Sequence, residues 1–227
     1  SDDGRLFLHG DETARIGVID ASTGRWLATY DLGSESPKGD FEDIEIIGSD
    51  LYLMTSKGRI LRTALPPKEQ RDGSLPYTSF DTRADRWCEL EGMAYDPADR
   101  ALLLGCKNMK GSRWAGPAVL RWSLDEQRFA TPDHVLLRGA SPIPVGAEPS
   151  FRPSALVVDT AAGQWVVISS ADSRVAISDR RGRILASAAL PKSHRQPEGL
   201  ALGAGGLVYV SDEGGKGLGS VSVYACR

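Results

Sequence analysis

The stretch that decides the fold runs from Glu89 to Cys106 and reads ELEGMAYDPADRALLLGC. It opens with an acidic residue and a glycine, Glu91 and Gly92, and then has a short apolar run. A polar, proline-containing segment at 96–100 separates this run from a second apolar run at 101–105. Two short apolar runs separated by a turn of this composition are typical of a β-hairpin.

The same pattern of a polar entry, an apolar run, a turn and a second apolar run occurs three more times, at 40–54, 152–168 and 196–210. The entry positions are spaced 49, 63 and 44 residues apart, and they are Glu42, Glu91, Ser154 and Glu198. Such a period is typical of four-stranded propeller blades, with longer loops accounting for the wider spacing. A β-sandwich also has regularly spaced strands, but it does not require a repeated motif at each entry strand.

The sequence therefore predicts an all-β protein, a β-propeller with five blades, with six blades as the alternative. A four-stranded sheet cannot bury both of its faces alone, whereas packing between blades buries both faces and shelters the strand edges. We expect one propeller domain over 1–227, in which the first strand of each blade lines a central channel. The five repeats are 1–39, 40–88, 89–150, 151–195 and 196–227.

The first repeat departs from this pattern. Strands are expected at 5–10, 14–21 and 25–30, but no acidic entry strand precedes them. Either an entry strand was lost at the N-terminus or another segment of the chain supplies it. Residues 66–76 form a polar insert with three prolines, which we interpret as a surface loop.

The bulk composition argues against two kinds of partner. A formal net charge of -3 does not indicate the basic surface that binds nucleic acid. No apolar run approaches the roughly 20 residues of a membrane-spanning helix. We therefore expect no nucleic-acid partner and no membrane span. We also expect a monomer. Because the chain starts at Ser1 rather than at a methionine, the lack of a leader says little about its compartment.

The three cysteines do not have the spacing of a metal-binding cluster. If the strands on either side of the turn at 96–100 pair, Cys88 and Cys106 lie near the same end of one hairpin. A disulfide between them would form in an oxidising compartment, and two buried thiols are the alternative. Cys226 would then be the one cysteine outside this bond.

Three segments resemble a known family: LEGMAYD at 90–96, RPSAL at 152–156 with SSADS at 169–173, and QPEGLA at 196–201. In these the sequence resembles the SdiA-regulated family, the YjiK-like β-propellers of bacterial cell envelopes, over nearly the whole chain. The resemblance implies a propeller, a periplasmic or secreted location and a bound calcium ion. It implies no particular reaction. The chain departs from the family pattern in its first repeat and at Ser154, which stands where the family has an acid.

The glutamates of the repeat form the candidate metal site. Each precedes the same apolar strand, so approximate rotational symmetry places Glu42, Glu91 and Glu198 at one mouth of the channel. Clustered carboxylates raise one another's pKa unless a positive charge neutralises them. Calcium, a hard cation that takes oxygen ligands, is one candidate for this role. Lys107 and Arg152 are the other, and they would make a metal unnecessary.

Further side chains are expected around the same mouth, and the candidate ligand-binding residues are Arg152, Lys107, Asp172, Ser154 and Trp114. Trp114 stands in a loop beside Lys110 and Arg113, whereas the tryptophans on strands are expected to pack between blades. Each entry glutamate also has a structural interpretation, in which it accepts backbone hydrogen bonds from a neighbouring blade. Gly92 and Gly199 are expected to permit close packing of the entry strands.

No catalytic residue can be assigned from the sequence. It contains no Gly-x-Ser-x-Gly motif, no His-Glu-x-x-His motif and no phosphate-binding loop. The favoured hypothesis is a non-enzymatic binding module of the cell envelope, whose acidic, calcium-binding funnel takes a small molecule or an envelope protein. The alternative is a metal-dependent hydrolase, similar to lactonase or phosphoesterase propellers, with Asp172 or His9 as its base. That alternative rests on fold analogy alone.

Overall fold

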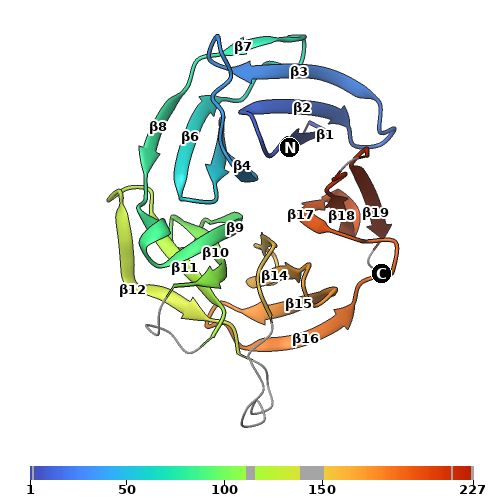
Figure 1. The fold of residues 1–227 in the computed structure, drawn as a ribbon. Coiled ribbons are helices and arrows are strands. Elements are labelled where there is room, and N and C mark those ends of the chain that lie inside the picture. Colours follow the sequence, from blue (N-terminus) through green and yellow to red (C-terminus); the bar gives the residue numbers. More distant parts are fainter. Residues whose placement is uncertain (2, 111–115, 139–150, 216, 226–227) are drawn as a thin grey trace. The chain divides into compact units, whose positions relative to one another are not determined.

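The computed structural model describes residues 1, 3–110, 116–138, 151–215 and 217–225. Within these residues the chain forms nineteen strands in five small sheets (Figure 1). It divides into two compact units, unit 1 (Ser1–Arg83) and unit 2 (Ala84–Arg227). Unit 1 contains two of the sheets, and unit 2 contains the other three.

Blade 1 has the strand order β1-β2-β3-β7. Its strands are β1 (Arg5–His9), β2 (Arg15–Asp20), β3 (Trp26–Leu32) and β7 (Gly73–Leu75). β1 lies at one edge of this sheet and contacts β4, the entry strand of the next blade. β1 is therefore the entry strand of blade 1, and the interpretation of the first repeat as lacking one is wrong. The acidic motif is missing there, but the strand itself is present.

The insert at 66–76 supplies the fourth strand of blade 1. β7 lies within it and pairs in parallel with β3, with Leu75 opposite Leu32 (Figure 1). Leu75 is buried in the apolar core of unit 1. The Tyr30 hydroxyl donates a hydrogen bond to the Gln70 carbonyl at 2.7 Å. The interpretation of this segment as a surface loop alone was wrong.

Blade 2 has the order β4-β5-β6-β8, in which all neighbours are antiparallel. Its strands are β4 (Phe41–Ile47), β5 (Asp50–Thr55), β6 (Arg59–Ala64) and β8 (Thr78–Asp81). The two blades of unit 1 share one apolar core, which includes Ile16, Tyr30, Phe41, Leu53 and Leu61. Burial between blades is the packing that the repeated apolar runs predicted.

Unit 2 contains blades 3, 4 and 5, with the orders β12-β11-β10-β9, β13-β14-β15-β16 and β17-β18-β19. Their strands are β9 (Cys88–Asp96), β10 (Ala101–Met109), β11 (Ala118–Ser123), β12 (Arg128–Leu136), β13 (Ala155–Asp159), β14 (Gln164–Ser169), β15 (Arg174–Asp179), β16 (Ile184–Ala189), β17 (Pro197–Gly203), β18 (Leu207–Asp212) and β19 (Ser220–Ala225). The core between blades 3 and 4 is built around Trp165, which is fully buried among Leu103, Val119 and Leu156.

The entry strands of unit 2 lie side by side. β9, β13 and β17 each lie at the edge of their own sheet, and β13 contacts both of the others. A Cβ atom on Gly92 would lie 3.2 Å from the backbone nitrogen of Leu156, so this glycine permits the close approach of β9 and β13. The predicted adjacency of the entry strands near 90–95, 154–158 and 199–202 is confirmed within unit 2, and in unit 1 the entry strand β4 neighbours β1, which the sequence did not identify as an entry strand.

The fold class is the predicted one, an all-β β-propeller with five blades. The helices in the described part of the chain are two three-residue 3-10 turns, Ala84–Arg86 and Ala204–Gly206. Neither they nor any other described segment forms a helix that is long and apolar enough to cross a membrane. One strand tryptophan departs from the predicted packing, because Trp26 is 57% exposed and its ring covers Gly17.

Cys88 and Cys106 form a disulfide with a Cα separation of 5.6 Å. The prediction that they approach within bridging range is confirmed. Both cysteines are fully buried. The bond joins the first residue of β9 to the part of β10 where the pairing register shifts, next to Cys106.

Candidate functional site

A bulge in β10 places Lys107 beside the entry strand of blade 3. The pairing of β9 with β10 is regular as far as Gly105, shifts at Cys106 and shifts again before Asn108. Bulges of this kind redirect a side chain and interrupt the ladder. The Lys107 ammonium forms an ion pair with the carboxylate of Glu91, whose side chain is only 6% exposed. Lys107 is thus the positive charge that neutralises Glu91.

The next residue along β10, Asn108, connects Glu89 to Arg152. Its Nδ2 donates a hydrogen bond to Glu89 Oε2 at 2.7 Å, and its Oδ1 accepts one from Arg152 at 3.4 Å. Arg152 is exposed and belongs to the segment that leads into β13. The two predicted cationic residues, Lys107 and Arg152, are therefore both anchored at the end of β10.

Ser154 belongs to the framework of the site. It is 2% exposed, and its hydroxyl donates to the Pro197 carbonyl at 2.9 Å. The same oxygen accepts a hydrogen bond from the backbone N–H of Ser170 at 3.0 Å. Ser154 thereby connects the segment before β13 to Pro197 at the start of β17, and also to the turn between β14 and β15. Ser154 was predicted to bind a ligand, but the structure shows its side chain almost fully buried.

Asp172 organises the turn between β14 and β15. Its Oδ2 accepts a hydrogen bond from the Ser169 hydroxyl at 2.5 Å, and its backbone N–H donates to the Ser169 oxygen at 3.4 Å. The residue is half-buried. One of its carboxylate oxygens therefore accepts a local hydrogen bond, and among the described residues none donates to the other.

Glu198 is the entry carboxylate of blade 5. It is half-buried on β17, and its Oε1 accepts a hydrogen bond from Gln196 Nε2 at 3.0 Å. Burial raises the pKa of Glu198, and so does the neighbouring Glu213, whereas the Gln196 hydrogen bond and the charge of Lys107 lower it. Among the residues that the structure describes, none forms an ion pair with Glu198. Within the described part of the chain, this carboxylate therefore lacks a direct counter-charge.

Gln196 is a site residue that the sequence reasoning missed. Its side-chain amide contacts the carboxylates of both Glu198 and Glu213. Side chains two residues apart point to the same face of a strand, so the position of Gln196 two residues before Glu198 could have indicated this contact.

His194 and Asp212 form a buried polar chain behind this cluster. The Nδ1 of His194 lies 2.6 Å from Asp212 Oδ2, and its Nε2 lies 2.5 Å from the Tyr224 hydroxyl. The other oxygen of Asp212 accepts the backbone N–H of Gln196 at 3.1 Å. Asp212 thereby fixes the segment that carries Gln196 and Glu198.

Two predicted residues are not part of this cluster as described. Trp114 lies outside the described residues. Glu42 lies half-buried on β4 of unit 1, where it has interactions of its own. The convergence of Glu42 with Glu91 and Glu198 stays a prediction.

The described donor groups do not fit a calcium ion. Calcium takes roughly six to eight oxygen ligands. Within the described ranges, no group of three or more His, Cys, Asp or Glu side chains is placed to hold a metal. In unit 2, Glu91 is already paired with the Lys107 ammonium, which occupies the position that a cation would need.

The raised pKa of Glu198 predicts a pH-dependent stability. A carboxyl group with a higher pKa in the folded state binds its proton more tightly there, so the free energy of unfolding falls as the pH rises from about 4.5. Glu198→Gln removes this dependence. The variant should be more stable than the unmodified protein at neutral pH and equally stable at pH values well below 4.5.

Urea unfolding at a series of pH values measures this difference. Glu12→Gln, the same change at an exposed carboxylate of unit 1, is the matched control and should leave the pH profile unchanged. A Glu198→Gln difference that is constant across the pH range would show that burial does not penalise this charge.

Comparison with known proteins adds evidence about the fold only. No family model matches the chain, and no curated protein sequence matches it. A protein of unknown function from Bacteroides caccae has a TM-score of 0.51 at 15% identity, and the match covers 93% of this chain and 66% of that one. A structural genomics protein of unknown function from Bacteroides thetaiotaomicron has a TM-score of 0.57 at 13% identity, over 92% of this chain and 50% of that one.

The hydrazine synthase of Kuenenia stuttgartiensis is similar over 100% of this chain and 61% of its own, with a TM-score of 0.50 at 12% identity. The chain thus spans 50 to 66% of the length of these three structures. At such identities the likeness shows the fold alone, because one fold supports many functions.

Proposed function

We propose that this chain is a non-enzymatic binding module of the cell envelope and that it holds a small organic amine against Glu198. The observation that carries the proposal is the state of this carboxylate, which is half-buried and has a raised pKa. Removing an ionised carboxylate from water costs free energy unless a positive charge or hydrogen bonds compensate for it. A ligand that brings a positive charge to Glu198 recovers that free energy on binding.

The neighbouring side chains favour a ligand that also has an anionic or polar end. Glu213 is exposed next to Glu198 and reinforces the attraction for an amine. Lys107 and Arg152 lie at the end of β10, and the charge of Lys107 is close enough to lower the pKa of Glu198. An amine would lie against the two carboxylates, and a carboxylate or hydroxyl of the same ligand would face Arg152.

The disulfide supports the envelope location. Disulfides form and persist in oxidising compartments such as the bacterial periplasm and the extracellular space, and they are rare in the cytosol. Cys88 and Cys106 are bonded and fully buried, next to the cluster that contains Glu91 and Lys107. We therefore place the module in the periplasm or outside the cell.

Binding without catalysis agrees with how the polar groups are used. Both ring nitrogens of His194 are hydrogen-bonded within the protein, so neither is available to accept a proton from a substrate. The Lys107 ammonium is paired with Glu91. A metal-dependent hydrolase stays the alternative hypothesis.

Thermal unfolding in the presence of simple amines tests the proposal. Ethanolamine and γ-aminobutyrate should raise the melting temperature of the unmodified protein above its value in sodium chloride of the same ionic strength. A gain of about 1 kcal/mol corresponds to about 2–4 °C for a chain of this size. Since γ-aminobutyrate also has a carboxylate for Arg152, we expect the larger shift with it.

Glu198→Gln should abolish both shifts, and Glu12→Gln should retain them. Equal shifts in all three proteins would mean that the amines act elsewhere. No shift with either amine would overturn the proposal. If calcium chloride alone stabilises the protein, and a chelator reverses this, the ligand at Glu198 is a metal ion and not an amine.

A further inference from the structure

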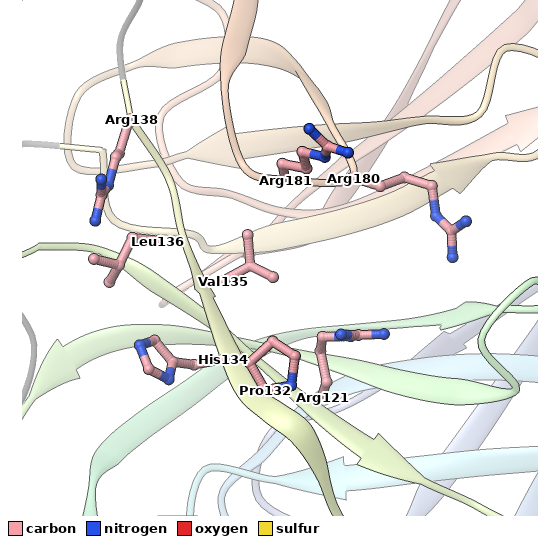
Figure 2. Close-up of a pocket in the computed structure, with 8 residues that line it drawn as sticks. All are labelled: Arg121, Pro132, His134, Val135, Leu136, Arg138, Arg180 and Arg181. Atoms are coloured by element: carbon pink, nitrogen blue, oxygen red, sulfur yellow. The ribbon is translucent and has the colours of Figure 1, made fainter.

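A cavity of about 400 Å³ in unit 2 lies apart from the entry-strand cluster. It is formed by β11 and the outer strand β12 of blade 3 and by the turn that follows β15 in blade 4 (Figure 2). Four of its eight lining residues are arginines, and none is acidic: Arg121, Arg138, Arg180 and Arg181. Pockets for small ligands usually have volumes of about 300–1,000 Å³, so the space suits a small molecule.

Two of the arginines are held in place by carboxylates from the turn between β9 and β10. The Nε of Arg180 donates a hydrogen bond to Asp96 Oδ2 at 2.9 Å, and a terminal nitrogen lies 2.8 Å from Asp99 Oδ2. Arg121 forms an ion pair with the same Asp99. The two carboxylates balance the two guanidinium charges and fix their orientation.

The other two arginines leave a net positive charge at the cavity. Arg138 and Arg181 are exposed, and within the described part of the chain neither side chain has an ion-pair partner. In addition, the Nε of Arg121 is buried and lacks a hydrogen-bond acceptor among the described residues. A buried donor without an acceptor costs free energy.

The two walls of the cavity are joined by backbone hydrogen bonds. The N–H of Arg138 donates to the Gly182 carbonyl at 2.8 Å, and the N–H of Ile184 donates to the Arg138 carbonyl at 2.8 Å. Gly182 has a φ of +78°, and a Cβ there would overlap the carbonyl oxygen of Leu136. The arginines are therefore presented from a fixed framework, which reduces the ordering cost of binding.

The remaining lining side chains give the cavity an apolar wall. Figure 2 shows the Val135 and Leu136 side chains on opposite sides of β12, with Leu136 on the side of Arg138 and His134 and Val135 on the side of Arg181. Guanidinium groups bind carboxylate and phosphate oxygens in pairs. A ligand for this space therefore combines an oxyanion with a small apolar body.

We propose that this cavity is a binding site for a small organic oxyanion, a carboxylate or a phosphate monoester that carries two negative charges. The arginine side chains hold its charged group, and an apolar side chain of β12 contacts its organic part. The site is independent of Glu198, because it is built from the outer strand of blade 3 and takes a ligand of opposite charge.

Isothermal titration calorimetry at low ionic strength with phenyl phosphate, phthalate and inorganic phosphate tests this site. We expect phenyl phosphate or phthalate to bind more tightly than inorganic phosphate, and the tighter of the two identifies the oxyanion. Added sodium chloride should weaken the binding, because exposed charges are screened. Absence of binding by both organic anions, or equal affinity for inorganic phosphate, would overturn the proposal.

The double variant Arg138→Gln, Arg181→Gln should weaken binding by at least about tenfold, since hydrogen bonds to charged groups are stronger than neutral ones. Both side chains are exposed, so the variant should fold normally, and its melting temperature checks this. Arg25→Gln, Arg59→Gln removes the same two charges from exposed positions of unit 1 and is the matched control. If both double variants bind equally well, the anion is not in this cavity.

Discussion

Replacing Lys107 with Met should lower the free energy of unfolding by about 3 kcal/mol at neutral pH. The Glu91 carboxylate is 6% exposed, and Lys107 is its ion-pair partner. Removing one partner of a buried ion pair costs about 3–5 kcal/mol, because the other charge is left without compensation. We expect the lower end of this range, since the Lys107 side chain is 38% exposed. Urea unfolding at neutral pH measures the effect.

A double-mutant cycle separates the lost charge pair from lost packing. Adding Glu91→Leu to Lys107→Met removes the uncompensated carboxylate and should restore most of the stability. Lys57→Met, at the matching turn of blade 2, removes an exposed lysine and should change stability little. If the single and double variants at this pair are equally unstable, the ion pair does not hold Glu91 in place.

Removing the disulfide with Cys88→Ala, Cys106→Ala should also cost about 3 kcal/mol. The bond closes a loop of 18 residues, and the chain-entropy model assigns about 3 kcal/mol to a loop of about 15 residues. The same loss should follow when the unmodified protein is unfolded in a reducing agent. Denaturant unfolding with and without the reductant measures both, and the reductant should have no further effect on the variant.

Cys226→Ala removes the cysteine that lies outside the bond and is the control for the loss of a thiol. It should unfold like the unmodified protein, with the same sensitivity to the reductant. A variant without Cys88 and Cys106 that is as stable as the unmodified protein would contradict the chain-entropy argument for this bond.

These two predictions concern one small region, so their effects should not be additive. Cys106 immediately precedes Lys107, and Cys88 immediately precedes Glu89, which binds Asn108. Neighbouring groups that share a backbone shift usually show coupling of about 0.5–3 kcal/mol. Loss of the disulfide should therefore weaken both the Lys107–Glu91 pair and any response to an amine at Glu198.

The local chemistry of the sequence determined the blades. Short apolar runs separated by glycine- and proline-containing turns specify hairpins, and their recurrence specifies blades, because a single such sheet cannot bury both faces. The same local logic predicted the role of Gly92 between neighbouring entry strands and the proximity of Cys88 to Cys106. These features depend on residues close together in the chain or repeated at a fixed period.

Contacts between distant segments were decided only by the tertiary structure. The sequence of β7 does not alternate between apolar and polar residues. It forms the fourth strand of blade 1 only because it pairs with β3, some 40 residues earlier in the chain. The Lys107–Glu91 pair depends on a bulge, and a shift of one residue in register has no signature in composition. The arginine-lined cavity gathers its arginines from β11, from the residues just after β12 and from the turn after β15. Packing between blades, which sets such distances, is not encoded in any one repeat.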